Sequence, residues 1–254
     1  MSSSEFLLEK IRKQIVSALA EYELITAEDK ILVAVSGGKD SSVLLYMLEE
    51  IRKRSPIPFT IQAVLLDQKQ PGFNVDAYRG WVESIGLKLA VIEQDTYAIV
   101  KEKTEPGKSY CGLCSRLRRG ILYNYAVEHG YTKIALGHHR DDFNETVLMN
   151  LFYSGMLAAM PPKLRSDDGR NVVIRPLCYL AEETIAEGAG YLNIPIIPCR
   201  LCGSQDGMKR GRIKKLLRDM EKERGDVSWN ILAALQNVRP SQLMDKNIFD
   251  FSKL

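Results

Sequence analysis

The stretch of sequence that decides the fold is Ile31-Leu32-Val33-Ala34-Val35-Ser36-Gly37-Gly38-Lys39-Asp40-Ser41. Its first five residues form an unbroken apolar run, which is typical of a parallel strand buried on both faces. Two adjacent glycines follow, and the apolar residues from Val43 onward predict a helix. A strand, loop and helix in this order place backbone N–H groups and the positive end of a helix dipole at the carboxyl edge of a sheet. The stretch therefore predicts an anion-binding loop, to which the hydroxyls of Ser36 and Ser41 and the charge of Lys39 add further ligands.

Outside this loop, apolar runs alternate with helical patterns along most of the chain. Further strands are expected at 59–66, 87–92, 133–136 and 172–177, and helices at 41–52, 77–84, 115–129, 141–153, 182–191 and 209–224. Strands that alternate with helices of this length predict an α/β fold with a doubly wound parallel sheet.

The chain is expected to divide into three parts. Residues 1–28 hold an amino-terminal helix whose apolar stripe, from Phe6 to Leu19, is expected to pack on the sheet. Residues 29–205 form the main α/β domain, and residues 206–254 form a small, basic, helical extension. The run at 209–218 holds six basic residues and no acid. Such a run is more often a solvated helix face than a binding site for a polyanion.

The composition and the absence of long apolar runs predict a cytoplasmic protein that has no membrane partner. The chain has 254 residues, of which 45% are hydrophobic, and a formal net charge of +3. Its first residues lack the apolar core of a secretory signal, and no eighteen apolar residues follow one another.

The anion-binding loop has the form S-G-G-x-D-S. This spacing fits neither the G-x-x-x-x-G-K-[ST] loop nor the dinucleotide fingerprint, and an ordinary strand-to-helix turn is the plain alternative. The hexapeptide resembles the loop of the PP-loop ATP pyrophosphatases, which cleave ATP between its α- and β-phosphates. The resemblance implies that ATP is bound by Ser36, Gly37, Gly38, Lys39, Asp40 and Ser41, with Lys39 and Asp40 also catalytic.

A second motif follows the strand expected at 133–136 and reads Gly137-His138-His139-Arg140-Asp141-Asp142-Phe143-Asn144-Glu145-Thr146. Two carboxylates at a helix start can cap the helix, or they can bind Mg²⁺ beside a triphosphate. The motif resembles that of PP-loop enzymes acting on transfer RNA, which implies that Gly137 and His138 contact ATP and that Asp142 is catalytic and binds magnesium. Asp67, at the end of the strand at 59–66, is as well explained by a turn as by contact with ATP.

The five cysteines include two C-x-x-C pairs, Cys111 with Cys114 and Cys199 with Cys202. An odd number of cysteines without a secretion signal favours metal or redox chemistry over a disulfide framework. Two such pairs are typical of zinc or of an iron–sulfur cluster, and the spacing does not choose between them. Cys178, within an apolar stretch, is expected to be an inert core thiol.

Several long motifs in the same order identify the chain as similar to the tRNA 2-thiocytidine synthetase family over about residues 29–251. These motifs are Asp67-Gln68-Lys69-Gln70-Pro71-Gly72-Phe73, Cys111-Gly112-Leu113-Cys114-Ser115-Arg116-Leu117-Arg118-Arg119, Met160-Pro161-Pro162-Lys163-Leu164 and Pro198-Cys199-Arg200-Leu201-Cys202-Gly203-Ser204-Gln205. The resemblance implies the adenine nucleotide α hydrolase-like fold and a [4Fe-4S] cluster held by Cys111, Cys114 and Cys202, with Cys199 unassigned.

The same resemblance implies a reaction and its partners. ATP would adenylylate the C2 oxygen of a cytidine in tRNA, expected at position 32, and sulfur delivered through the cluster would replace that oxygen. The partners implied are tRNA, a sulfur donor such as a cysteine desulfurase, and a second copy of the chain in a homodimer. Six basic side chains could hold the RNA backbone, namely Arg116, Arg118, Arg119, Lys209, Arg210 and Arg212.

Three other functions fit parts of the pattern. A thiouridine-forming relative would share the loop and the cluster but modify another base. A lysidine-type PP-loop ligase would need no cluster and would hold a structural zinc at the cysteines. A non-enzymatic RNA-binding or redox-sensing protein would have no use for the loop at 36–41.

Overall fold

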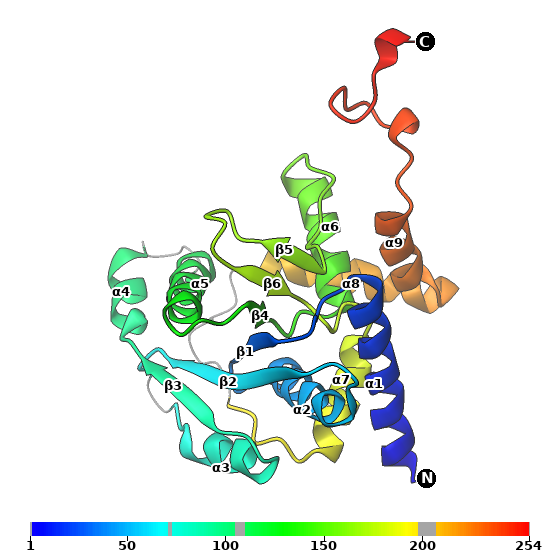
Figure 1. Ribbon diagram of the computed structural model, residues 1–254. Helices are drawn as coiled ribbons and strands as arrows, with labels where there is room; N and C mark the ends of the chain where they lie inside the picture. The colour runs from blue at the N-terminus through cyan, green and yellow to red at the C-terminus, as the bar shows by residue number, and fades with distance from the viewer. Residues whose placement is uncertain (1, 71–72, 105–109, 198–206, 254) are drawn as a thin grey trace.

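A single six-stranded sheet organises the protein (Figure 1). The computed structural model describes residues 2–70, 73–104, 110–197 and 207–253. The strands are β1 (Asp29–Val35), β2 (Phe59–Asp67), β3 (Leu89–Glu93), β4 (Lys133–Ala135), β5 (Lys163–Arg165) and β6 (Val172–Ile174). Their order is β3-β2-β1-β4-β6-β5, with parallel pairing except at the edge, where β5 runs antiparallel to β6. The predicted α/β fold with a doubly wound sheet is confirmed, with one antiparallel edge strand added.

Helices cover both faces of the sheet (Figure 1). They are α1 (Ser3–Glu21), α2 (Lys39–Arg54), α3 (Asp76–Ser84), α4 (Thr96–Lys103), α5 (Cys111–Glu128), α6 (Arg140–Tyr153), α7 (Glu182–Tyr191), α8 (Gly207–Arg224) and α9 (Val227–Gln236). Helices α1, α2, α3 and α7 lie on one side and α5 lies on the other, while α8 and α9 pack against α6.

Strand β1 is buried from both sides, as its unbroken apolar run predicts. Alternate side chains of a strand point to opposite faces. Ile31, Val33 and Val35 pack into the core formed with α2 and α7, and Leu32 and Ala34 pack against α5. Full burial of each such aliphatic side chain stabilises the fold by about 1.5–3 kcal/mol. The strand that carries the anion-binding loop is therefore fixed in the centre of the molecule.

Several details differ from the sequence-based expectations. Helices α4 and α9 and strand β5 are short or weakly patterned and were not expected. The strand expected at 172–177 ends at Ile174, because Pro176 has no backbone N–H to donate to a neighbouring strand. The stripe of α1 begins after Phe6, which is 67% exposed, and α1 packs on α7 and α2 as neighbouring helices.

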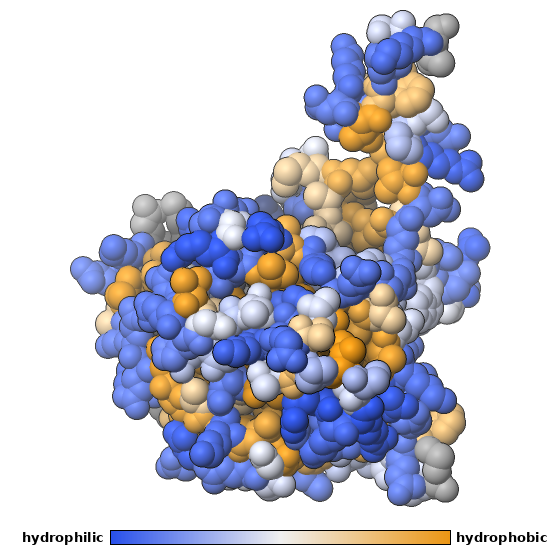
Figure 2. Space-filling model, in the orientation of Figure 1, coloured by the Kyte–Doolittle hydropathy of each residue, from blue (hydrophilic) through white to orange (hydrophobic). Residues whose placement is uncertain are grey.

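The chain beyond α9 runs away from the body of the protein (Figure 1). Hydrophobic residues lie on the surface of this segment, among them Val238, Met244 and Ile248 (Figure 2). Within the described residues, no helix combines the length and apolar character that a membrane crossing requires.

Candidate functional site

The loop between β1 and α2 is closed by its own hydroxyl groups. The backbone N–H of Ser36 donates to Ser41 Oγ at 3.1 Å, and the N–H of Gly38 donates to Ser36 Oγ at 3.3 Å. Gly37 has a φ of +74°, and a Cβ there would lie 2.8 Å from Ile197 Cβ. Ile197 N–H in turn donates to the carbonyl of Gly37 at 2.9 Å. Only glycine combines this conformation with so close a neighbour, so the loop holds a preformed shape.

The second motif touches the first through the backbone. Gly137 follows β4, the strand beside β1. A Cβ on Gly137 would lie 2.8 Å from Ser41 N, 2.9 Å from Ser41 Cα and 3.0 Å from the carbonyl carbon of Asp40. The missing side chain therefore lets the two motifs meet at the carboxyl edge of the sheet, where open α/β sheets bind their ligands.

A buried histidine links the carboxylates of both motifs. His139 is 6% exposed; its Nε2 lies 3.4 Å from Asp142 Oδ2 and 3.9 Å from Asp40 Oδ1, and its Nδ1 lies 3.6 Å from Asp141 Oδ2. Burial alone would lower the pKa of His139, but Asp141, Asp142 and Asp40 outweigh it and raise that pKa. The three carboxylates thus favour the protonated form of His139, which lies among them.

His138 has the opposite character. Burial, together with the positive charge of Arg175, lowers the pKa of His138 to about 4, so the ring is neutral at neutral pH. Arg175 Nε donates to His138 Nδ1 at 3.3 Å. We assign the ring proton to Nε2 from this hydrogen bond, which leaves Nε2 as a donor for a ligand.

Helix α8 pairs with the carboxylates of this site. Arg210 forms ion pairs with Asp142 and Glu145, and Lys214 pairs with Glu182 at the start of α7. Glu182 Oε1 also lies 3.1 Å from Lys39 Nζ, so an ion chain joins the loop to α8. Burial by itself raises the pKa of Glu182, but hydrogen bonds from Lys214 and Lys39 outweigh it and lower that pKa to about 2.

The residues present fit a magnesium ion that is shared with a ligand. No three His, Cys, Asp or Glu side chains form a ready metal site in the part of the chain that the structure describes. Mg²⁺ is commonly held by one or two carboxylates together with phosphate oxygens of a substrate, and Asp142 and Asp40 both lie within 4 Å of His139 Nε2. Asp142 is engaged by Arg210 and by the N–H of His139, at 3.0 Å, so a metal ion has to compete with both.

Cys114, of the first cysteine pair, lies at the same edge of the sheet. Cys114 Sγ donates to Gln68 Oε1 at 3.1 Å, and Thr96 Oγ1 donates to the same oxygen at 3.0 Å. Gln68 directly follows β2, so the amino-terminal turn of α5 is anchored beside the carboxyl end of that strand. Cys111 is the first residue of α5, and its side chain lies outside what the structure describes. Cys199 and Cys202 lie outside the described residues, and Cys178 is buried as expected.

The remaining sequence-predicted residues fall into two groups. Asp67 shapes a turn, since its Oδ1 accepts the N–H of Lys69 at 2.8 Å and its Oδ2 lies 3.3 Å from Lys69 Nζ. Arg116, Arg118 and Arg119 lie on α5 beyond the cysteine pair. On α8, Arg212 is exposed and Lys209 Nζ lies 5.0 Å from the centre of the Tyr153 ring. Arg210, one of the six predicted RNA-binding side chains, pairs with Asp142 and Glu145 of the second motif.

Three contributors to the site were missed by the sequence reasoning. His139 is the second histidine of a doublet, and only the first was singled out. Arg175 follows β6 directly, which is a position where a polar side chain reaches the ligand edge of a parallel sheet. Glu182 carried no signal beyond a helix start.

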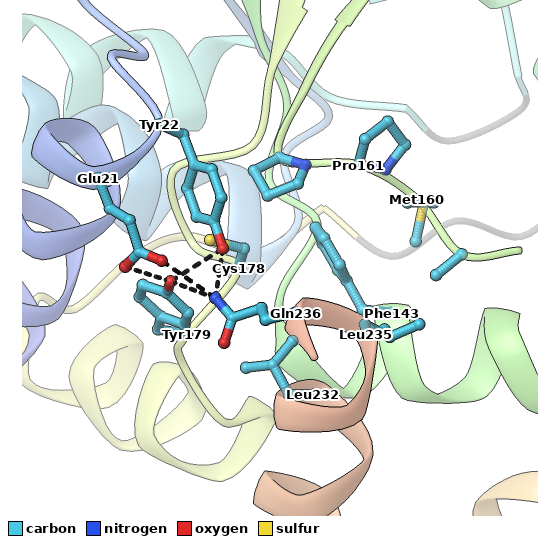
Figure 3. A pocket seen from close by; sticks show the side chains of 12 residues that line it. Glu21, Tyr22, Phe143, Met160, Pro161, Cys178, Tyr179, Leu232, Leu235 and Gln236 are labelled. Carbon is cyan, nitrogen blue, oxygen red and sulfur yellow. Dashed lines mark hydrogen bonds between the residues drawn. The ribbon is translucent and has the colours of Figure 1, made fainter. Parts of the chain in front are cut away.

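A cavity of about 590 Å³ lies beside the site, between the end of α1, α9 and the segment from Ala159 to Pro162 (Figure 3). On one side a polar cluster gathers, in which Tyr179 donates to Glu21 at 2.6 Å and Gln236 donates to Tyr179 at 2.8 Å. On the other side stand Met160 and Pro161. The carbonyl of Pro161 accepts from Arg175 Nη1 at 2.6 Å, which joins the cavity wall to the site.

Comparison with known proteins gives consistent results. A sequence-family model described as the PP-loop domain matches residues 7–195. A tRNA-cytidine(32) 2-sulfurtransferase of Bdellovibrio bacteriovorus is 57% identical over 96% of this chain and 94% of its own length. One of Hahella chejuensis is 52% identical over 96% of this chain and 86% of its own length. The U34-tRNA thiolase NcsA from Methanococcus maripaludis, solved with its [4Fe-4S] cluster, superposes with a TM-score of 0.73 at 21% identity, covering 93% of this chain and 81% of that one, which shows a shared fold.

Proposed function

Because this chain belongs to the tRNA-cytidine(32) 2-sulfurtransferase family of PP-loop proteins, we propose that it replaces the C2 oxygen of a tRNA cytidine, expected at position 32, with sulfur. It is a sulfur-transferring enzyme of the PP-loop type that thiolates tRNA. The finer steps, ATP-dependent adenylylation of the base and sulfur delivery through a cluster, are the proposal.

One observation carries the proposal: the loop after β1, the second motif after β4 and Cys114 beside the end of β2 all lie at the carboxyl edge of one sheet. A base that enters at this edge would lie between a nucleotide and a thiol-bearing helix. Activation and sulfur transfer at the same C2 atom require this arrangement.

The nucleotide step uses groups that are already in place. Amide groups of the loop, with Lys39, bind the β- and γ-phosphates, and Nε2 of His138 is available to donate to a phosphate oxygen. The C2 oxygen of the base attacks the α-phosphorus, and pyrophosphate leaves. The base oxygen is thereby converted into part of AMP, a good leaving group. Asp142 would hold Mg²⁺, which would supply positive charge to the departing phosphates.

The sulfur step depends on the cysteines. We propose that Cys111, Cys114 and Cys202 would hold a [4Fe-4S] cluster, which would supply the sulfur that replaces the AMP-bearing oxygen at C2. The thiol of Cys114 fits this role, because it lies at the ligand edge and thiolates are the common ligands of such clusters. The role of Cys202 rests on the family motif alone.

RNA contact is proposed for α5 and α8. Arg116 and Arg119 on α5, and Lys209 and Arg212 on α8, are exposed, as contact with a phosphodiester backbone requires. Arg118 is proposed to join them, and Arg210 links this surface to Asp142. A sulfur donor such as a cysteine desulfurase and a second copy of the chain are the proposed protein partners. The exposed apolar residues beyond α9 are in keeping with protein contact.

The ion chain makes a prediction about Lys39. A Glu182→Gln variant should lower the turnover number about tenfold, because a neutral amide cannot orient the ammonium groups of Lys39 and Lys214. Nucleotide binding should not weaken, because the substitution also removes a negative charge near the phosphates. Steady-state kinetics that separate kcat from KM for ATP provide the measurement. Glu183→Gln is the matched control, since Glu183 is exposed on the same turn of α7. Equal kcat values for the two variants would show that Glu182 does not position Lys39.

The reaction itself is tested by mass spectrometry of nucleosides. Protein purified without oxygen, after iron and sulfide analysis, is incubated with ATP, a sulfur source and a tRNA transcript that has cytidine at position 32. We expect 2-thiocytidine to form, and none to form when a transcript with uridine at that position is used. Formation of 2-thiouridine or lysidine in place of 2-thiocytidine would replace the proposal with one of the related PP-loop activities.

A further inference from the structure

Arg175 is a buried cation that has no anionic partner among the described residues. It follows β6 directly and is 7% exposed. Nε donates to the neutral ring of His138, at 3.3 Å, and Nη1 donates to the carbonyl of Pro161, at 2.6 Å. Within the described part of the chain, no carboxylate forms an ion pair with it, and no hydrogen bond is made by Nη2. A buried charge without a counter-charge is costly, so a protein that keeps one usually uses it.

The surroundings of Arg175 increase this cost. Burial is the main cause that lowers the pKa of the Arg175 guanidinium; Tyr123 opposes this shift and the positive charge of Arg119 adds to it. The carboxylates of the site are already engaged elsewhere, Asp142 and Glu145 by Arg210 and Glu182 by Lys39 and Lys214. The missing negative charge has therefore to come from outside the described chain.

The position of Arg175 indicates what supplies that charge. The strands β1, β4 and β6 are neighbours in the sheet. Their carboxyl ends carry, in that order, the anion-binding loop at 36–41, His138 and Arg175. On the other side, Arg175 is close to Tyr123 and Arg119 of α5, the helix that begins with the cysteine pair. Arg175 thus lies between the nucleotide loop and α5, where the reacting base has to enter.

We propose that Arg175 binds a phosphate oxygen that arrives with a substrate. The planar guanidinium is suited to phosphate because two of its N–H groups can engage two oxygens at once. The phosphate is the α-phosphate of ATP or the phosphodiester beside the target nucleotide. This choice of sources rests on the proposed function, whereas the need for an anion rests on the burial and contacts of Arg175.

Binding measurements on two variants test the proposal and separate its two sources. Arg175→Met removes the charge at similar length, and Arg175→Lys keeps the charge but loses the planar fork. Arg165→Met is the control, since Arg165 is an exposed arginine of β5 that donates to the carbonyl of Gly169. Calorimetric titrations with magnesium α,β-methylene-ATP and with an unmodified tRNA transcript measure each affinity, and circular dichroism checks the fold.

If the α-phosphate is the ligand, Arg175→Met should weaken α,β-methylene-ATP binding by roughly tenfold to a hundredfold and leave tRNA binding unchanged. If the phosphodiester is the ligand, tRNA binding should weaken by a similar factor, with a salt dependence lower by about one phosphate contact. Arg175→Lys should recover part of either loss. The proposal would be overturned if Arg175→Lys, and Arg175→Met where it folds, bound both ligands as tightly as the control Arg165→Met. These affinities do not depend on catalytic activity. If the wild-type protein formed no 2-thiocytidine, that result would contradict the proposed function but not the proposal for Arg175.

Discussion

Replacing Cys114 with alanine should abolish the formation of 2-thiocytidine while the affinity for α,β-methylene-ATP stays at the wild-type value. The thiol of Cys114 is fixed at the ligand edge of the sheet by Gln68, at 3.1 Å, and it belongs to the helix that begins with Cys111. The anion-binding loop at 36–41 is closed by hydrogen bonds among its own residues, and α5 contributes no residue to it. Nucleoside mass spectrometry measures the first effect, calorimetry measures the second, and iron content measures the loss of a cluster ligand.

Cys178→Ala is the control for this variant. Cys178 is 1% exposed in the core, and burial raises the pKa of its thiol to about 12, so it is neither accessible nor a thiolate at neutral pH. The control should lose some thermal stability through a small cavity and keep both sulfur transfer and iron content. Product formation by Cys114→Ala at the rate of the control would remove Cys114 from the sulfur site and favour a structural role for the pair.

Replacing Gly137 with alanine should strongly weaken nucleotide binding, although the substitution adds a single carbon atom. The new Cβ would lie 2.8 Å from Ser41 N and 2.9 Å from Ser41 Cα, which are backbone atoms of the loop and α2. Backbone cannot rotate away as a flexible side chain can, so the loop or the second motif has to shift. We expect the affinity for α,β-methylene-ATP to fall by about a hundredfold or more, because a displacement of even 1 Å spoils the geometry of several phosphate contacts.

Gly120→Ala separates this effect from a general cost of adding a methyl group. Gly120 lies in α5, and a Cβ there would meet nothing within 4 Å. The control should bind nucleotide normally and gain up to about 1 kcal/mol in stability, because alanine favours the helix over glycine. Calorimetry of both variants, with thermal unfolding to check folding, gives the comparison. Wild-type affinity in a folded Gly137→Ala protein would show that the close approach of the two motifs is not needed for nucleotide binding.

Much of the site could be predicted from short segments. The loop at 36–41 combines a strand, a glycine pair and a helix start within a dozen residues, and the left-handed φ of Gly37 is in keeping with it. The alternation of strands and helices likewise predicts that the ends of β1 and β4 share one edge. These features depend on local conformation and on a regular topology, so they can be inferred along the chain.

The partners of the charged side chains could not be predicted in this way. The six basic residues at 209–218 favoured a solvated face or an RNA surface, yet Arg210 and Lys214 are directed to the carboxylates of Asp142, Glu145 and Glu182. The position of Arg175 after an expected strand was compatible with a ligand contact, but its burial and its neighbours were known only from the fold. A charged residue can be solvated, paired or poised for a ligand, and its sequence neighbours do not distinguish these states.

The sequence by itself therefore determined three features. Short-range periodicity specifies the α/β fold, the glycine pair specifies the anion-binding loop at 36–41, and the ordered motifs specify the family. Only the tertiary structure decided which charges meet. Lys39 and Glu182 are 143 residues apart in the chain, and Arg210 and Asp142 are 68 apart. Such pairs form because the sheet brings distant strand ends to one edge and because α8 packs on α6. The energy of each pair depends on burial and distance, which exist only in the folded molecule.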